Sequence, residues 1–201
     1  MKNSNLMFLV ICLALIFSGC SKDDSLAPVT SQDEQMTPAL KFSGTPYSGT
    51  TVPNGPPMDL GEITELPNGN VKIMGFTGPW LENVEDEDGN HLPFLSGPSV
   101  YCENVAYNKW EPDIHVWGNV EITPEEGGGV WKGHFNGYGT FQIPPDPVTG
   151  YDFFAYPVEV DGIVIKLTGH GGDIQGMVVQ AAYSIDILNN GLVYYIEGEY
   201  K

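Results

Sequence analysis

The residues best suited to hold a ligand lie on one face of an alternating run, residues 113–122. Trp117 shares this face with His115, Asn119 and Glu121, while aliphatic side chains occupy the opposite face. A flat indole can stack on a sugar ring or line an apolar pocket, and polar neighbours fix the orientation of a bound molecule. The alternation leaves open whether this face meets solvent or a polar-lined cavity. We predict a ligand-binding site here, centred on Trp117.

Two more residues complete the predicted binding set, Trp131 in the next run and His170 in a glycine-rich segment. His170 precedes Asp173, which suggests acid–base chemistry, but the glycines around it favour a bend that carries a surface histidine. No two of the four histidines have the i, i+2 or i, i+4 spacing of a local zinc motif. We therefore predict no catalytic residue, no metal site and no cofactor.

The densest acidic cluster runs from Glu82 to Asn90. Asp86, Asp88 and Asn90 have the 1-3-5 spacing of a calcium loop, but glycine stands at the fourth position and no glutamate at the twelfth. We interpret the cluster as a solvated hairpin tip around Asp88 and Gly89.

The N-terminal residues indicate a covalent lipid anchor. Lys2 precedes an apolar run from Leu6 to Phe17, which is too short to span a bilayer as a stable helix and is typical of a secretory signal. The run ends in Ser18-Gly19-Cys20, which resembles a bacterial lipobox with cleavage before Cys20 and lipid on its sulfur. The resemblance implies two or three acyl chains, and so a permanent attachment to the membrane. The alternative is a plain signal peptide followed by a chance cysteine.

Residues 21–24, Ser-Lys-Asp-Asp, resemble a signal that sends Gram-negative lipoproteins to the outer face of the outer membrane; the alternative is the start of a solvated linker. Residues up to about 40 are too polar to fold alone and would form a tether of roughly 25 Å. The predicted organisation is a signal peptide over 1–19, a lipidated cysteine and tether over 20–40, and one domain over 41–201. We expect outer-membrane anchoring, with exposure on the cell surface left open.

The charge of the chain excludes some partners. It carries 26 Asp plus Glu against 8 Lys plus Arg, for a net charge of −18, and none of the 8 is arginine. A nucleic-acid binder needs a basic surface, so nucleic acid is excluded as a partner. Without arginine, the usual bidentate clamp for phosphate or carboxylate is missing as well. Neutral sugars, apolar molecules and cations remain.

Period-2 alternation is widespread and no helical stripe stands out, which predicts an all-β domain. Turn signals such as Asn68-Gly69 and Asp88-Gly89 separate the runs. Eight to ten short strands favour a closed antiparallel barrel of about eight strands, with a β-sandwich as the alternative. The predicted strands lie near 61–66, 70–77, 98–107, 113–122, 129–136, 138–143, 151–158, 161–169, 174–187 and 192–200.

Three glycine-containing segments, two of which also contain tryptophan, carry a family resemblance, at residues 116–123, 129–133 and 169–177. They resemble bacterial proteins related to the allene oxide cyclase and dirigent families. The resemblance covers about residues 95–190 and implies an eight-stranded calycin-type barrel that is often trimeric. The stretch from Gly169 to Gly176 is one residue short of the family pattern, and the catalytic residues of the plant enzymes have no match here. The resemblance therefore implies the fold without the cyclase activity.

Three functions fit the sequence. The first is an envelope lipoprotein that binds a small apolar or neutral ligand or a glycan without catalysis. The second is an isomerase or cyclase acting in the barrel mouth, and the third is a structural surface protein that forms dimers or trimers. The first two predict a cavity of about 300 Å³ or more, whereas the third predicts a filled barrel with a large apolar outer face.

Overall fold

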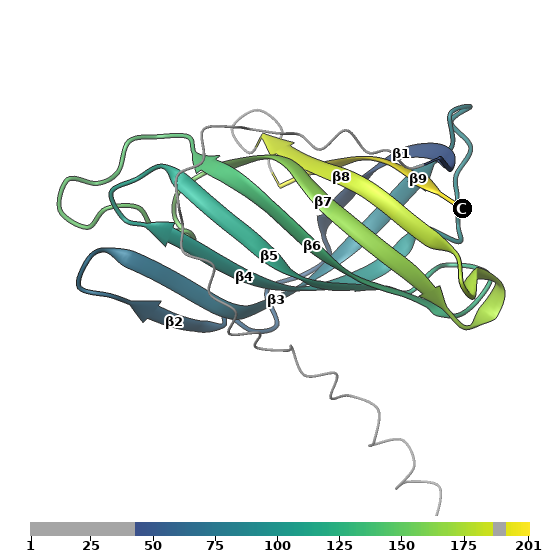
Figure 1. Ribbon diagram of the computed structural model, residues 1–201, viewed down its shortest axis with the longest axis horizontal. Coiled ribbons are helices and arrows are strands. Elements are labelled where there is room, and N and C mark those ends of the chain that lie inside the picture. The colour runs from purple at the N-terminus through teal and green to yellow at the C-terminus, as the bar shows by residue number, and fades with distance from the viewer. Residues whose placement is uncertain (1–42, 187–191) are drawn as a thin grey trace, which may run out of the picture.

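Residues 43–186 and 192–201, the part of the chain that the structure describes, fold into a closed antiparallel β-barrel (Figure 1). The structure is a computed structural model. The prediction of an all-β barrel of about eight strands is confirmed, and the sandwich alternative is wrong. The elements are β1 (Thr45–Pro53), β2 (Glu62–Glu65), β3 (Asn70–Glu85), β4 (Gly97–Asn108), β5 (Asp113–Ile122), β6 (Val130–Phe141), β7 (Val158–His170), the 3-10 helix η1 (Gly172–Ile174), β8 (Val178–Asp186) and β9 (Tyr194–Tyr200).

The ring of strands closes through β3, which is long enough to have two partners on one side. Its first half pairs with β2 and its second half with β1, from Ser48 opposite Glu85 to Pro53 opposite Trp80. The order around the ring is β1-β9-β8-β7-β6-β5-β4-β3, and β2 lies outside the ring as an extension of the sheet. Closure removes the open edges that an eight-stranded sheet would otherwise present.

The barrel interior is filled by side chains from alternate positions of each strand. In β5 the aliphatic residues of the run are buried, as the period-2 pattern predicts. Large aromatic rings fill the middle of the barrel, including Tyr101 and Phe135, whose ring centroids lie 5.6 Å apart. The inside of this barrel is therefore a packed core.

A bulge at Gly75 decides which residues of β3 face inward. Val71 and Ile73 are buried before it, and Glu82 and Val84 after it, so the inward parity changes at the bulge. Gly75 has a φ of 82°, a conformation that favours glycine, and its N–H donates to Asn104 Oδ1 at 3.0 Å. Without this extra residue, Glu82 would point to solvent.

Strand β1 is absent from the strands predicted from the sequence. Two prolines and four small polar residues conceal its alternation, and only Tyr47 and Thr51 are buried in it. The predicted strand 70–77 instead continues to Glu85, and the two strands predicted over 129–136 and 138–143 form the single strand β6. These differences arise because pairing partners, which local composition does not reveal, extend and join the strands.

The strand predicted over 151–158 is mostly loop. Asp152 begins a turn there, because its carboxylate accepts from the Phe154 N–H at 3.0 Å and its carbonyl from the Ala155 N–H at 3.1 Å. The aromatic residues of this segment pack on the barrel end instead of alternating across a sheet. Tyr151 stacks on Phe141 with a centroid distance of 4.3 Å.

The acidic cluster divides between surface and interior. Its second half forms the predicted exposed turn, where Asp86 Oδ1 accepts from the backbone N–H groups of Asp88 and Asn90. The hydrogen bond from the Asn90 side chain, together with those two backbone bonds, lowers the pKa of Asp86. Glu82, at the other end of the cluster, is only 1% exposed and points into the barrel.

Within the described residues, no helix is both long and apolar enough to cross a membrane. The predicted signal peptide, Cys20 and the tether lie outside the described residues.

Candidate functional site

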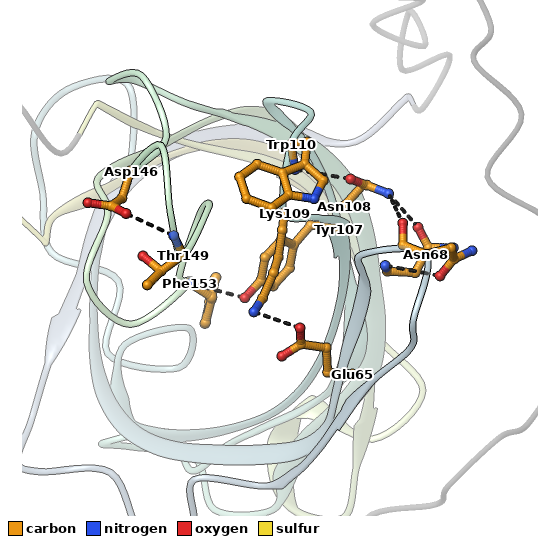
Figure 2. A network of polar contacts seen from close by, with 10 residues as sticks. Glu65, Asn68, Tyr107, Asn108, Lys109, Trp110, Asp146, Thr149 and Phe153 are labelled. Atoms are coloured by element: carbon orange, nitrogen blue, oxygen red, sulfur yellow. Dashed lines mark hydrogen bonds and ion pairs between the residues drawn. The ribbon is translucent and has the colours of Figure 1, made fainter.

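Three connecting segments come together at one end of the barrel, which we call the loop end: the β2–β3 turn (66–69), the β4–β5 turn (109–112) and the β6–β7 loop (142–157). The Lys109 N–H donates to the Gly69 carbonyl at 2.9 Å, and the Lys109 carbonyl accepts from the Tyr151 N–H at 2.9 Å. Figure 2 shows Lys109 reaching Glu65, with Nζ 2.7 Å from the carboxylate. These contacts hold the three segments side by side, so they form one continuous surface.

Trp110 is the largest exposed aromatic residue of the loop end, with 52% of its surface accessible. Its backbone N–H donates to Asn108 Oδ1 at 3.0 Å, which fixes the turn. The indole rests on Gly69, where an added Cβ would lie 3.1 Å from the ring and φ is +86°. Figure 2 shows the ring face-on beside Asn108 and Asn68. The ring is thus held in place while a large part of it stays open for stacking.

Three asparagines lie beside this indole. Asn108 Nδ2 donates to Asn70 Oδ1 at 2.8 Å and to the Asn68 carbonyl at 3.3 Å, and Asn68 Oδ1 accepts from the Asn70 N–H. These bonds use the oxygen atoms of the Asn68 and Asn70 side chains. Among the described residues, the two side-chain NH₂ groups have no hydrogen-bond partner, so they can donate to a ligand.

An aromatic cluster supports the loop end from below. Tyr107, Phe141, Tyr151 and Tyr156 contact one another with centroid distances of 4.3–6.3 Å. Around it lie apolar side chains that are at least 40% exposed, namely Leu66, Ile143, Val148 and Phe154. The loop end therefore combines a rigid base, an open aromatic ring, free amide donors and apolar surface.

The loop end lies opposite the end at which the chain enters the barrel. β1 begins at Thr45, which pairs with Tyr200 near the C-terminus. The C-terminus and the start of β1 lie at the right of Figure 1, whereas the turns and the loop of the loop end lie at the left.

The predicted set around Trp117 lies on the outer wall of the barrel, so the cavity interpretation of this face is wrong. Trp117 and His115 stack with a centroid distance of 4.6 Å, and Tyr138 of β6 stacks on His115 at 4.7 Å. His115 Nε2 lies 2.7 Å from Asn136 Oδ1. The three rings cover much of one another, and Tyr138 is the most exposed of them.

The other predicted residues do not join Trp117 in one site. Glu121 is paired with Lys132 at 2.7 Å on the outer wall, and Asn119 is exposed there. Trp131 is fully buried, and its Nε1 donates to the Phe94 carbonyl at 2.7 Å, as expected of a core residue. His170 is exposed at the end of β7, away from the loop end.

Two glutamates inside the barrel were not among the predicted site residues. Glu82 accepts from Ser99 Oγ and Tyr101 Oη at 2.9 Å each and from Tyr183 Oη at 3.2 Å. Burial raises the pKa of Glu82, and the donating hydroxyl groups offset part of the rise. Burial alone raises the pKa of Glu103 to about 7. Period-2 alternation places Glu103 on the inner face of β4 with Tyr101 and Val105, a signal that the sequence did contain.

The cavity found inside the barrel among the described residues has no room for a ligand of ordinary size. It lies beside Glu103 and has a volume of about 20 Å³, close to the roughly 10–15 Å³ that a single water needs. A binding or catalytic site in the lumen would require a cavity of about 300 Å³, and the cavity beside Glu103 is far smaller. Within residues 43–186 and 192–201, no three His, Cys, Asp or Glu side chains gather where they could hold a metal ion.

No protein-family model matches this chain, and comparison with curated proteins and with solved structures finds no similar protein. The resemblance to the allene oxide cyclase and dirigent families therefore stays a prediction.

Proposed function

We propose that this protein is a lipid-anchored lipoprotein of the outer membrane that binds a neutral glycan at the loop end of its barrel, without catalysis. The observation that carries the proposal is the half-exposed Trp110 ring beside the free amide donors of Asn68 and Asn70. An aromatic face with amide donors nearby suits the apolar face and the hydroxyl oxygens of a sugar ring.

The position of the loop end agrees with this role. A tether that enters at Thr45 would connect the anchor to the opposite end of the barrel, so the loop end would face away from the membrane. The net charge of −18 disfavours anionic glycans and leaves neutral ones. The filled lumen argues against the isomerase alternative, because a substrate would have no space beside Glu103.

Trp110→Ala should weaken binding of a neutral oligosaccharide by about 2 kcal/mol, roughly 30-fold in Kd, because it removes the stacking surface. We would titrate the protein by calorimetry with neutral hexasaccharides of glucose, mannose and xylose. Trp117→Ala on the outer wall is the matched control and should leave the Kd nearly unchanged. If Trp117→Ala abolishes binding and Trp110→Ala does not, the site lies on the outer wall.

The proposed anchor is tested by Cys20→Ala. Without the sulfur that receives the lipid, the protein should leave the membrane fraction or keep its signal peptide uncleaved. Cell fractionation and the mass of the product distinguish these two results. Normal cleavage together with normal membrane fractionation of the variant would show that Cys20 carries no anchor.

A further inference from the structure

The small cavity inside the barrel is lined mostly by apolar groups, and several of its lining side chains also carry a polar atom. Thr51 of β1, Trp80 of β3 and Glu103 of β4 line it together with aliphatic and aromatic side chains. Thr51 is 2% exposed, and Glu103 has only the small accessible surface that a cavity-lining residue keeps. The three groups thus come from three strands and meet at one small space.

These polar groups lack partners within the protein. Thr51 Oγ1 and Trp80 Nε1 are buried and make no hydrogen bond within the described residues. Thr51 lies opposite Glu82 in the β1–β3 pair, and its hydroxyl group is close enough to that carboxylate to help lower the Glu82 pKa. The pair does not reach hydrogen-bond geometry, so the hydroxyl group still has a hydrogen bond to offer a molecule in the cavity. The Glu103 carboxyl group makes no hydrogen bond or ion pair among the described residues. Tyr194 lines the same cavity, and burial together with the nearby Glu103 raises the pKa of its hydroxyl group. Leaving a buried polar group without a hydrogen bond is unfavourable, so these groups around one cavity indicate that a small polar molecule occupies it.

The chemistry of the three groups restricts what can fill the cavity. The indole N–H of Trp80 only donates, so the occupant must accept a hydrogen bond, which excludes a metal cation or ammonium. The carboxyl group of Glu103 disfavours an anion. The volume of about 20 Å³ excludes molecules larger than water. Water both accepts and donates, and it can have two to four polar partners.

We propose that this cavity is a binding site for one water molecule, which bridges Thr51 and Trp80 to Glu103. The water accepts from Trp80 Nε1, exchanges a hydrogen bond with the Thr51 hydroxyl group and bonds to the Glu103 carboxyl group. Tyr101 and Tyr183 line the same cavity and donate to Glu82. The bound water thus completes a polar network that lies around both buried glutamates in the middle of an otherwise apolar core.

The test is a water–protein nuclear Overhauser measurement on the whole chain, labelled with ¹⁵N and purified in detergent. The Trp80 indole proton should show a cross-peak to a long-lived water, and Trp80→Phe should remove that peak and so assign it. Trp131 is the internal control, because its indole nitrogen is also buried but donates to the Phe94 carbonyl. Its indole proton should show no such cross-peak.

Thr51→Val, which replaces the hydroxyl by a methyl group of similar size, should reduce the Trp80 cross-peak at least twofold. Glu103→Gln keeps a donor and an acceptor and should retain the peak. A folded wild-type protein without a Trp80 water cross-peak would overturn the proposal. So would a peak that Thr51→Val leaves unchanged.

Discussion

Replacing Glu82 by alanine is expected to reduce the free energy of unfolding by about 4 kcal/mol. The change leaves three buried hydroxyl groups, those of Ser99, Tyr101 and Tyr183, without their acceptor, at about 1–2 kcal/mol each. It also opens a cavity in a closely packed core. Since domains of this size are stable by only about 5–15 kcal/mol, Glu82→Ala should lower the midpoint of urea denaturation severely.

Glu82→Gln is the matched control. Its carboxamide has nearly the same shape and keeps one oxygen acceptor and one donor group, so it should cost less than half as much as alanine. Tyr183→Phe removes the longest of the three hydrogen bonds and should cost about 1 kcal/mol. Equal stability of the alanine variant and wild type in urea would show that the buried network contributes nothing to the fold.

Glu103 is expected to make the protein less stable as the pH rises from about 4.5 to about 7. Burial raises the pKa of this carboxyl group to about 7 in the folded protein, from 4.5 in an ordinary environment. Between these values the unfolded chain loses the proton while the folded protein keeps it, so rising pH favours unfolding. The loss is complete above about pH 7 and amounts to about 3 kcal/mol.

Glu103→Gln removes this titration. We would measure the free energy of unfolding of the variant and of wild type by urea denaturation at pH 4 and at pH 8. The difference between variant and wild type should shift in favour of the variant by about 3 kcal/mol from pH 4 to pH 8. Glu82 still contributes a pH dependence of the same sign, because burial raises its pKa as well. Glu126→Gln removes an exposed carboxylate and should change the stability by less than about 0.5 kcal/mol at either pH. Identical pH profiles of wild type and Glu103→Gln would contradict the prediction.

The barrel could be predicted from the sequence because alternation in strands such as β5 and β8 is a local property. What could not be predicted depends on partners distant in the chain. β1 has few large side chains, and its strand character comes from pairing with β3 and β9. The inward position of Glu82 follows from the bulge at Gly75, whose N–H is satisfied by Asn104 of another strand. From composition alone, Glu82 was predicted to belong to an acidic cluster on the surface.

The candidate site also combines a feature that the sequence reveals locally with contacts between residues that are distant in the chain. The sequence predicted an aromatic binding site and centred it on Trp117, whose polar neighbours share its face of the strand, although alternation alone could not say whether that face points inward. Trp110 lies in a turn without periodicity, and its surroundings arise only when the turns at 66–69 and 109–112 meet. Asn68 and Asn70 are forty residues or so from Trp110 in sequence, so no local pattern connects them.

Hydrogen–deuterium exchange with and without the neutral hexasaccharide that binds best would test the proposed site most directly. Stacking on Trp110 and hydrogen bonds from Asn68 and Asn70 should slow exchange in residues 66–70 and 109–112, and should leave the outer wall of β5 and β6 unchanged. Protection of residues 113–121 and 134–138 with no change at the loop end would contradict the proposed site, and so would the failure of every neutral hexasaccharide to bind.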